Sequence, residues 1–179
     1  MERVTDSASP HRGQNKILVS ACLMGYQVRY NGSEKAQLAT ALARWQRERR
    51  LVIFCPELAA GLPTPRPPAE IVAADGDKVL QARGQIIEIT GRNVTAHYQL
   101  GAWLALRAAR ENGCIAALLT DGSPTCGSRF IYNGSFSGQR RSGAGVAAAL
   151  LRQHGIAVFA DQQIAELTAW MEQRDENSM

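Results

Sequence analysis

Three cysteines stand where a folded chain could present thiolates to a metal. Cys22 and Cys55 come just after short apolar stretches, and Cys126 lies in a segment rich in Gly, Ser and Thr. None of the four cysteines in the chain forms a CxxC pair, so local spacing does not define a site. In a reducing compartment, such cysteines favour metal binding or catalysis over structural disulfides.

Four short apolar runs predict the strands that must position these cysteines. The runs cover residues 16–20, 51–54, 114–120 and 156–160. Helical patterns separate or follow them over residues 34–49, 95–112, 143–154 and from 161 onward. Strands that alternate with helices predict an α/β fold, with a three-layer, mostly parallel, Rossmann-like sheet and helices on both faces.

The segments between these elements predict loops and one small excursion. Closely spaced prolines in 61–68 forbid a helix and predict a stiff loop. Two β-rich stretches within 71–89 predict a small hairpin, and the polar segment 121–142 predicts a loop. The helix over 95–112 should bury one face, made of Leu100, Trp103, Leu104 and Ala108.

The direction of the strands should place three of the cysteines at one edge of the sheet and the fourth at the opposite edge. Ligands in open α/β sheets bind beyond the carboxyl ends of the strands, where we expect Cys22, Cys55 and Cys126 to meet in one crevice. Cys114 opens the third strand, whose roughly seven residues at about 3.3 Å each place it about 20 Å away. We therefore expect Cys114 to be a buried hydrophobe and not a ligand.

Three thiolates admit several occupants. A catalytic zinc has three protein ligands and one open position. An iron–sulfur cluster held by three cysteines leaves one iron open to substrate. A redox disulfide with a resolving thiol is a third arrangement. The residue types alone do not choose among them.

Polar residues near the cysteines are candidates for proton transfer. Glu57 comes two residues after Cys55 and precedes the stiff loop, which suits a general acid or base. Hydroxyls near Cys126 either act on a metal centre or substrate or cap the turn; they belong to Ser123, Thr125 and Ser128. Asp121 either joins them or shapes the turn. Three cations could reach substrate but are expected to be solvated: Arg66, Arg129 and Arg140.

The composition predicts one globular domain. The chain has 179 residues, of which 45% are hydrophobic, and it has no apolar run long enough to cross a bilayer. We expect an N-terminal tail over 1–14, a single domain over 15–174 and a C-terminal tail over 175–179. We expect a cytoplasmic location.

The basic charge does not by itself predict nucleic-acid binding. It comes from 17 arginines and 3 lysines that are scattered along the chain. The tight cluster of Arg47, Arg49 and Arg50 lies at a predicted helix end, where cations complement the helix dipole. We favour a solvated face over an RNA footprint. A GxGxxA match at 143–148 does not directly follow a strand, so we interpret it as a helix start and expect no nucleotide cofactor.

Several segments of the chain together resemble the thiouracil desulfurase family. They read VSACLMG (19–25), RYNG (29–32), CPE (55–57), GLPTPRPPAE (61–70), SPTCG (123–127), IYNG (131–134) and FSG (136–138). They span the chain from Ile17 to about Val158. The chain departs from the family at Thr125, where the family often has Ser, and at Met24, which replaces a common Leu.

This resemblance implies a [4Fe-4S] cluster on Cys22, Cys55 and Cys126, with the fourth iron free of protein ligands. It implies conversion of 2-thiouracil or 4-thiouracil to uracil with release of hydrogen sulfide and no net redox change. Glu57 would activate water, and Ser123 would orient groups or relay a proton. The expected partner is a small thiolated pyrimidine, with thiolated tRNA less favoured. The alternatives are a Cys₃ zinc hydrolase and an iron–sulfur or RNA-binding module without activity.

Overall fold

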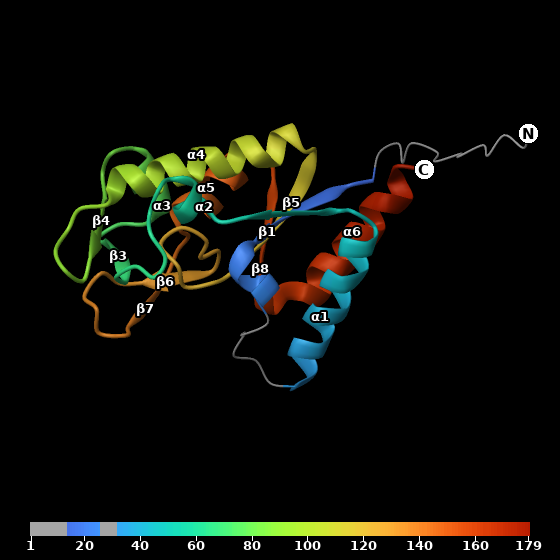
Figure 1. Ribbon diagram of the computed structural model, residues 1–179, viewed down its shortest axis with the longest axis horizontal. Helices are drawn as coiled ribbons and strands as arrows, with labels where there is room; N and C mark the ends of the chain where they lie inside the picture. The colour runs from blue at the N-terminus through green and yellow to red at the C-terminus, as the bar shows by residue number, and fades with distance from the viewer. Residues whose placement is uncertain (1–13, 26–31) are drawn as a thin grey trace, which may run out of the picture.

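A parallel sheet of four strands forms the centre of the protein (Figure 1). The computed structural model describes residues 14–25 and 32–179. The sheet contains β1 (Lys16–Ser20), β2 (Leu51–Phe54), β5 (Cys114–Leu119) and β8 (Ala157–Ala160), in the order β2-β1-β5-β8. All three pairings are parallel, which confirms the predicted sheet.

Helices cover both faces of this sheet, so the three-layer prediction is confirmed. On one face lie α1 (Gly32–Arg47) and α6 (Ile164–Asn177); on the other lie α4 (Thr95–Glu111) and α5 (Val146–Gln153). Alternate residues of β1 belong to separate cores: Ile17 and Val19 to that of α1 and α6, and Leu18 to that of α4 and α5.

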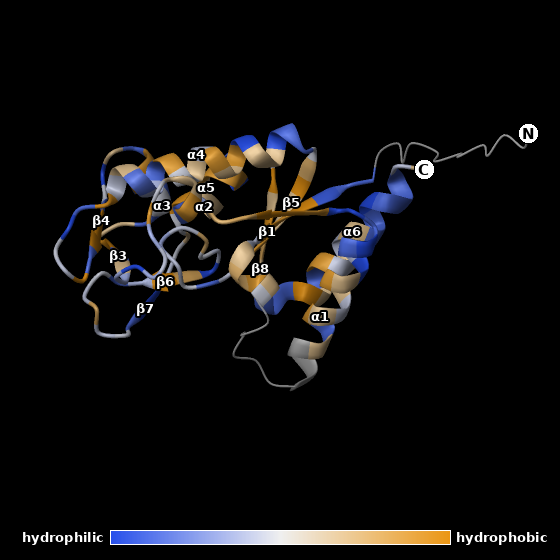
Figure 2. Ribbon diagram, in the orientation of Figure 1, coloured by the Kyte–Doolittle hydropathy of each residue, from blue (hydrophilic) through white to orange (hydrophobic). Residues whose placement is uncertain are grey.

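Because both faces are covered, the strands are near-continuous apolar runs, and Figure 2 shows β5 as mostly hydrophobic. Within residues 14–25 and 32–179, no helix combines the length and apolar character needed to cross a membrane.

Two small antiparallel sheets lie outside the central one. The first pairs β3 (Ala69–Val72) with β4 (Gln85–Glu88), and α3 (Gly76–Leu80) lies between them in the chain. The antiparallel pairing agrees with the small hairpin predicted over 71–89, but β3 begins earlier, at Ala69, and the helix between the two strands was not predicted. The second pairs β6 (Phe130–Tyr132) with β7 (Arg140–Ser142). We had predicted this segment as a loop, because strands of three residues leave almost no periodic signal.

The buried face of α4 differs from the prediction. Leu100 and Trp103 are about half exposed, at 49% and 52%. The packed face includes a glycine where α2 (Pro56–Ala59) approaches closely: a Cβ at Gly101 would lie 2.6 Å from the Pro56 carbonyl oxygen. The other small residues of this face are Ala102, Ala105 and Ala109. Tyr98 and Leu106 are buried on the same face, and the predicted Ala108 packs against the core from a partly buried position. The prediction is therefore wrong for Leu100 and Trp103.

Arg50 and the end of α6 also differ from the prediction. We expected Arg50 to be solvated and 175–179 to be a tail, but α6 continues to Asn177 and Arg50 is buried. The Arg50 guanidinium donates to both carboxylate oxygens of Asp175 at 2.9 Å, and to the backbone oxygen of Asn15 at 2.9 Å. This ion pair, in which one guanidinium nitrogen donates to both carboxylate oxygens, holds the end of α6 against the start of the sheet.

Candidate functional site

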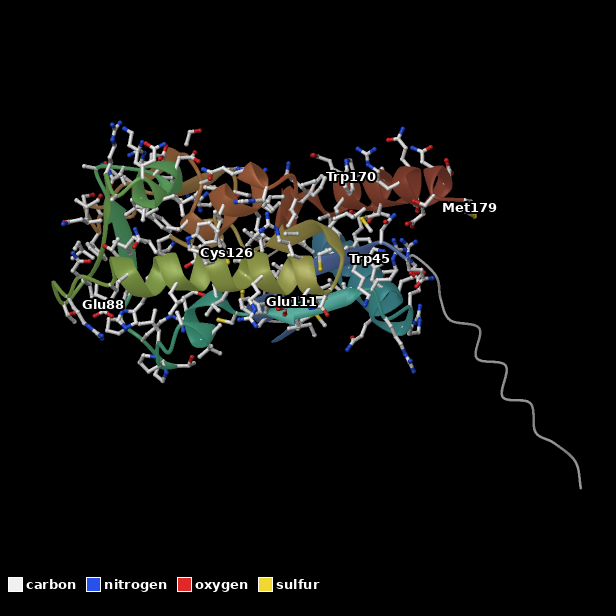
Figure 3. The ribbon with its side chains drawn as sticks, turned by 90° about the horizontal axis from the view of Figure 1, so that it is seen from above. Trp45, Glu88, Glu111, Cys126, Trp170 and Met179 are labelled. Carbon is white, nitrogen blue, oxygen red and sulfur yellow. The ribbon has the colours of Figure 1, made fainter. Side chains whose placement is uncertain are left out.

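Three cysteines lie at the carboxyl edge of the central sheet, where strand polarity predicted them. Cys22 lies in the 3₁₀ turn η1 (Ala21–Gly25) directly after β1, Cys55 follows β2, and Cys126 lies in the loop after β5. Cys22 is exposed, Cys55 is half-buried and Cys126 is buried. Figure 3 labels Cys126 within the body of the protein.

The fourth cysteine lies at the opposite end of the sheet. Cys114 opens β5 and pairs in register with Lys16, the first residue of β1. It belongs to the apolar core on the side of α4 and α5. Burial raises the pKa of the Cys114 thiol to about 11. The buried location of Cys114, at the end of β5 away from the other three cysteines, is the one predicted from the sequence.

The three edge thiols and Glu57 lie close enough to affect one another's protonation. Burial raises the pKa of Cys126 well above its usual range, and the charges of Glu57, Cys22 and Cys55 add to this effect. Burial also raises the pKa of Cys22, although its sulfur lies 2.8 Å from the Thr120 hydroxyl. Acidic groups that face one another in this way suit a positively charged centre between them.

Cys22, Cys55 and Glu57 line a cavity of about 1020 Å³. Its walls come from the proline-rich loop, β3, α4, the loop after β5 and the β6–β7 hairpin. The volume lies at the upper end of the range for small-molecule sites. A second hollow of about 560 Å³ lies between α1 and α6, and its lining contains no cysteine.

Glu57 is held in one orientation by groups from several parts of the chain. It lies in the first turn of α2. Pro56 is the first residue of this helix, a position that suits proline because an N–H there would have no partner within the helix. One carboxylate oxygen accepts a hydrogen bond from the Thr125 hydroxyl at 2.8 Å. The other accepts from the Cys55 thiol at 3.5 Å and lies 3.8 Å from the Arg66 guanidinium.

Asp121 shapes the loop that carries Ser123 and Cys126. Its Oδ1 accepts hydrogen bonds at 3.0–3.3 Å from four backbone N–H groups, those of Gly122, Ser128, Arg129 and Phe130. Its Oδ2 accepts from the Arg129 side chain at 3.0 Å. Burial opposes ionisation of Asp121, but the hydrogen bonds outweigh burial and lower its pKa. Asp121 was expected either to act at the site or to shape the turn, and its contacts match the second role.

The start of α5 holds the same loop from another side. The N–H groups of residues 146–148 have no partner within the helix, and they donate to the carbonyl oxygens of Pro124 and Thr125. Gly145 allows this contact, because a Cβ there would come within 2.5 Å of the Thr125 backbone. The GxGxxA match therefore lies at a helix start, as predicted.

Ser123 both caps this loop and lines the cavity. Its Oγ accepts hydrogen bonds from the backbone N–H groups of Thr125 and Cys126, both at 3.0 Å. Because the oxygen acts as acceptor in both bonds, the hydroxyl proton is free to be donated elsewhere. Ser123 lines the cavity, so that proton can be offered to a ligand there.

The three candidate arginines have different surroundings. Arg66 lines the cavity beside Glu57. Arg129 forms an ion pair with Asp121, and Arg140 stacks over the Phe130 ring, 4.2 Å from its centroid. Of these three arginines, Arg66 is therefore the one that lines the same cavity as Cys22 and Cys55.

Sequence reasoning missed several residues of the cavity. Tyr98 of α4, Glu70 of β3, and Tyr132 and Phe136 of the β6–β7 hairpin all line it. Burial and the charge of Glu57 raise the pKa of Tyr98 to about 12. Phe136 belongs to the FSG segment, a signal that could have marked it, whereas Tyr98 lies in a regular helix without a local motif.

The chain belongs to the 2-thiouracil desulfurase family, whose model matches residues 17–163. It is 43% identical over 151 residues to the uncharacterized protein YbbK of Bacillus subtilis (strain 168), a match that covers 84% of this chain and 99% of YbbK. It is also similar to the solved structure of the [4Fe-4S]-dependent thiouracil desulfidase TudS. That match has 40% identity and a TM-score of 0.73, and it covers 89% of this chain and 99% of TudS. These findings confirm the family that the motifs indicated.

The donor set at the edge of the sheet fits an iron–sulfur cluster. Cys22, Cys55 and Cys126 approach from three separate strand ends, and thiolates are the usual ligands of such clusters. Among residues 14–25 and 32–179, no three His, Cys, Asp or Glu side chains are grouped so as to hold a single metal ion. In a four-iron cluster each thiolate binds its own iron, so its ligands do not have to meet at one point.

Proposed function

We propose that this protein is a thiouracil desulfurase that converts 2-thiouracil or 4-thiouracil and water into uracil and hydrogen sulfide. A C=S bond is exchanged for a C=O bond, both protons of water leave with the sulfide, and no electrons are gained or lost. One observation carries the proposal: two thiols, those of Cys22 and Cys55, line a single cavity with the oriented Glu57 carboxylate. The third thiol, that of Cys126, is buried close enough for the charges of these three groups to raise its pKa. Family membership and the similarity to TudS support it.

Cys22, Cys55 and Cys126 would hold a [4Fe-4S] cluster. When bound, such a cluster supplies a Lewis acid with affinity for a thiocarbonyl sulfur. Cys22 and Cys55 line the cavity, whereas Cys126 is buried. A substrate in the cavity would therefore approach from the side of Cys22 and Cys55.

Glu57 is the residue that we propose as general base and acid. Its carboxylate lines the cavity, and the hydrogen bond from Thr125 at 2.8 Å fixes its direction. Glu57 would accept a proton from the water that attacks the thiocarbonyl carbon, and would return it to the departing sulfur. Ser123 would donate its unused hydroxyl proton to orient the substrate or relay a proton.

Anaerobic reconstitution tests this function. Iron and sulfide bound to the protein are quantified, either thiouracil is added, and uracil and released hydrogen sulfide are measured together. We expect the two products in equal amounts and in proportion to the iron loaded. Full iron loading without either product would contradict the proposal, and equal activity with zinc alone would support a zinc hydrolase instead.

We further propose that free thiolated bases, and not tRNA, are the substrates, and that the protein acts in the cytoplasm. Arg50 is buried in an ion pair with Asp175, and Arg129 is paired with Asp121, so the charges of these two are already balanced within the protein. The free thiols suit a reducing compartment. Affinity for unmodified tRNA should be weak and lost at moderate salt, as a filter-binding series would show. Tight binding at physiological salt would contradict this proposal.

A further inference from the structure

A strained aromatic residue lines the same cavity as Cys22 and Cys55. Phe136 has a φ of +55°, in the left-handed region that residues other than glycine rarely adopt. Backbone strain of this kind persists where the surroundings enforce it, and it is concentrated at binding sites. Phe136 lines the same cavity as Cys22 and Glu57, so its conformation bears on what that cavity can bind.

Glu70 enforces the conformation of Phe136. Its Oε1 accepts hydrogen bonds from the backbone N–H of Gly134 at 3.0 Å and from that of Phe136 at 3.2 Å. Glu70 belongs to β3, so its carboxylate connects the β3–β4 hairpin to the loop between β6 and β7. The two hairpins touch there, because a Cβ at Gly134 would lie 2.7 Å from the Ile71 carbonyl oxygen.

The base of the same loop is closed by its own side chains. The backbone N–H of Asn133 donates to the carbonyl oxygen of Gln139 at 3.0 Å, and the two side-chain amides bond at 3.0 Å. The Asn133 side-chain oxygen also accepts from the Ser135 N–H at 3.0 Å. The loop is therefore ordered before a ligand arrives, which lowers the entropy cost of binding.

We propose that Phe136 is a stacking wall for the pyrimidine ring and that Glu70 is its positioning residue. The inference rests on the proposed function, since it assigns the ring-binding part of that site. Thiouracil and uracil are flat heteroaromatic rings, and an aromatic side chain binds such a ring through its face. Stacking leaves the polar edge of the ring free, so the C=S group can face the thiols and Glu57.

Ring aromaticity can be tested separately from hydrogen bonding. Uracil and 5,6-dihydrouracil carry the same polar groups, but dihydrouracil is puckered and lacks an aromatic face. Binding of each to the iron-loaded protein is measured by anaerobic calorimetry. We expect Phe136→Leu to weaken uracil binding by about tenfold and to change dihydrouracil binding by less than about twofold. Phe136→Tyr, which keeps the ring, should keep the preference for uracil over dihydrouracil.

A matched control removes a ring that does not line the cavity. Phe159 packs on Trp170, with ring centroids 5.7 Å apart, in the core of α1 and α6. Phe159→Leu should leave the preference for uracil over dihydrouracil unchanged. Equal weakening of both ligands in Phe136→Leu, or no change in either, would overturn the stacking role. So would loss of the preference in Phe136→Tyr.

Two substitutions at Glu70 test the positioning role. Glu70→Gln keeps the carbonyl oxygen that accepts from Gly134 and Phe136, whereas Glu70→Ala removes it. We expect Glu70→Ala to lose most of the preference for uracil and Glu70→Gln to retain it. If both variants lose it equally, the charge of Glu70 acts on the ligand directly and the positioning role is wrong.

Sulfide release keeps this inference separate from the proposed function. A protein that prefers uracil through Phe136 but releases no sulfide from thiouracil would support the stacking wall and contradict desulfuration. A protein that releases sulfide, with an unchanged uracil affinity in Phe136→Leu, would support desulfuration and overturn the stacking wall. Iron content and thermal unfolding are measured for every variant.

Discussion

The core between α1, α6 and the sheet and the cavity edge of the sheet are held by different forces. In the core, fully buried apolar side chains such as Trp45, Leu167 and Met171 pack against β1 and β5. At the cavity edge, polar contacts set the positions: Asp121 holds the loop of Cys126, and Thr125 holds Glu57. The first region depends on packed volume and the second on directed hydrogen bonds.

This difference indicates what each region can tolerate. Apolar burial is non-directional, so the core of α1 and α6 should accept substitutions that conserve volume. A catalytic group must be held within a fraction of an ångström, which packing alone does not achieve at an open cavity. Substitutions in the core should therefore lower stability, whereas those at the cavity edge should lower activity.

The largest expected effect is loss of the cluster. Cys22→Ala, Cys55→Ala and Cys126→Ala should each abolish iron loading. The site has three thiolates, and we expect the cluster to need all of them. Cys114→Ala should keep iron and activity, because Cys114 lies at the amino end of β5. Iron analysis and visible absorbance after anaerobic reconstitution measure this.

Leu167→Ala in the opposite core is the matched comparison for the cysteine variants. It should lower the free energy of unfolding by about 2–5 kcal/mol and still load iron below its melting temperature. Full iron loading in any of the first three cysteine variants would disprove the ligand set. Loss of iron in Cys114→Ala alone would do the same.

Next in size is the loss of the proposed acid–base group. Glu57→Ala should keep its iron–sulfur absorbance and lower turnover by about 10² or more, as expected when a positioned base is removed. Ser123→Ala should show the same pattern with a smaller loss, because water can partly replace a hydroxyl. Hydrogen sulfide release per bound iron is the measurement. Normal turnover of Glu57→Ala with a full cluster would make Glu57 an ordinary loop carboxylate.

A smaller effect is expected from the group that orients Glu57. Thr125→Val keeps the shape of the side chain but removes the hydroxyl that bonds Glu57 at 2.8 Å. We expect kcat to fall by about tenfold with little change in KM or iron content, because only the direction of the carboxylate is lost. Thr125→Ser should restore most of the rate. A rise in KM alone, or failure of serine to restore the rate, would argue against this positioning role.

The smallest effect concerns Asp121 and pH. The pKa of Asp121 is lowered from the ordinary value of 3.8. Its charge therefore contributes stability that is fully present above that value and is lost as pH falls through the lower folded pKa. Asp121→Asn should cost about 1 kcal/mol at pH 7.

The pH dependence separates this charge effect from a packing effect. The difference between Asp121→Asn and the unmodified protein should shrink as the pH falls from 3.8 toward the lower folded pKa, because the unfolded chain takes up the proton before the native carboxyl does. Urea unfolding of both proteins over a pH series measures this. A difference that stays constant across the series would mean that the charge of Asp121 contributes nothing.

The strands and the sorting of the cysteines could be predicted from the sequence. Strands buried on both faces leave continuous apolar runs, which is why β1, β2, β5 and β8 were found within one residue of their ends. Parallel strands share one direction, so Cys22 and Cys55 had to lie at one edge and Cys114 at the other. Both signals are local, or follow directly from the order of the elements.

The packed face of α4 was predicted wrongly because hydrophobicity alone does not report how closely two backbones approach. Leu100 and Trp103 are apolar and three residues apart, yet both are half exposed, whereas the approach of α2 leaves room only for glycine at position 101. The distance between two helices is set by the whole fold, so no window of local sequence contains it.

The sequence by itself therefore determined the sheet, its direction and the edge where the thiols gather. The tertiary structure alone decided which polar groups meet there: Thr125 with Glu57, 68 residues apart, and Glu70 with the N–H of Phe136, 66 residues apart. Hydroxyls, carboxylates and amides bond equally well with many partners, and their local sequence does not name one. The pairing is decided by the loops that the close packing of α2, α5 and the two hairpins brings together.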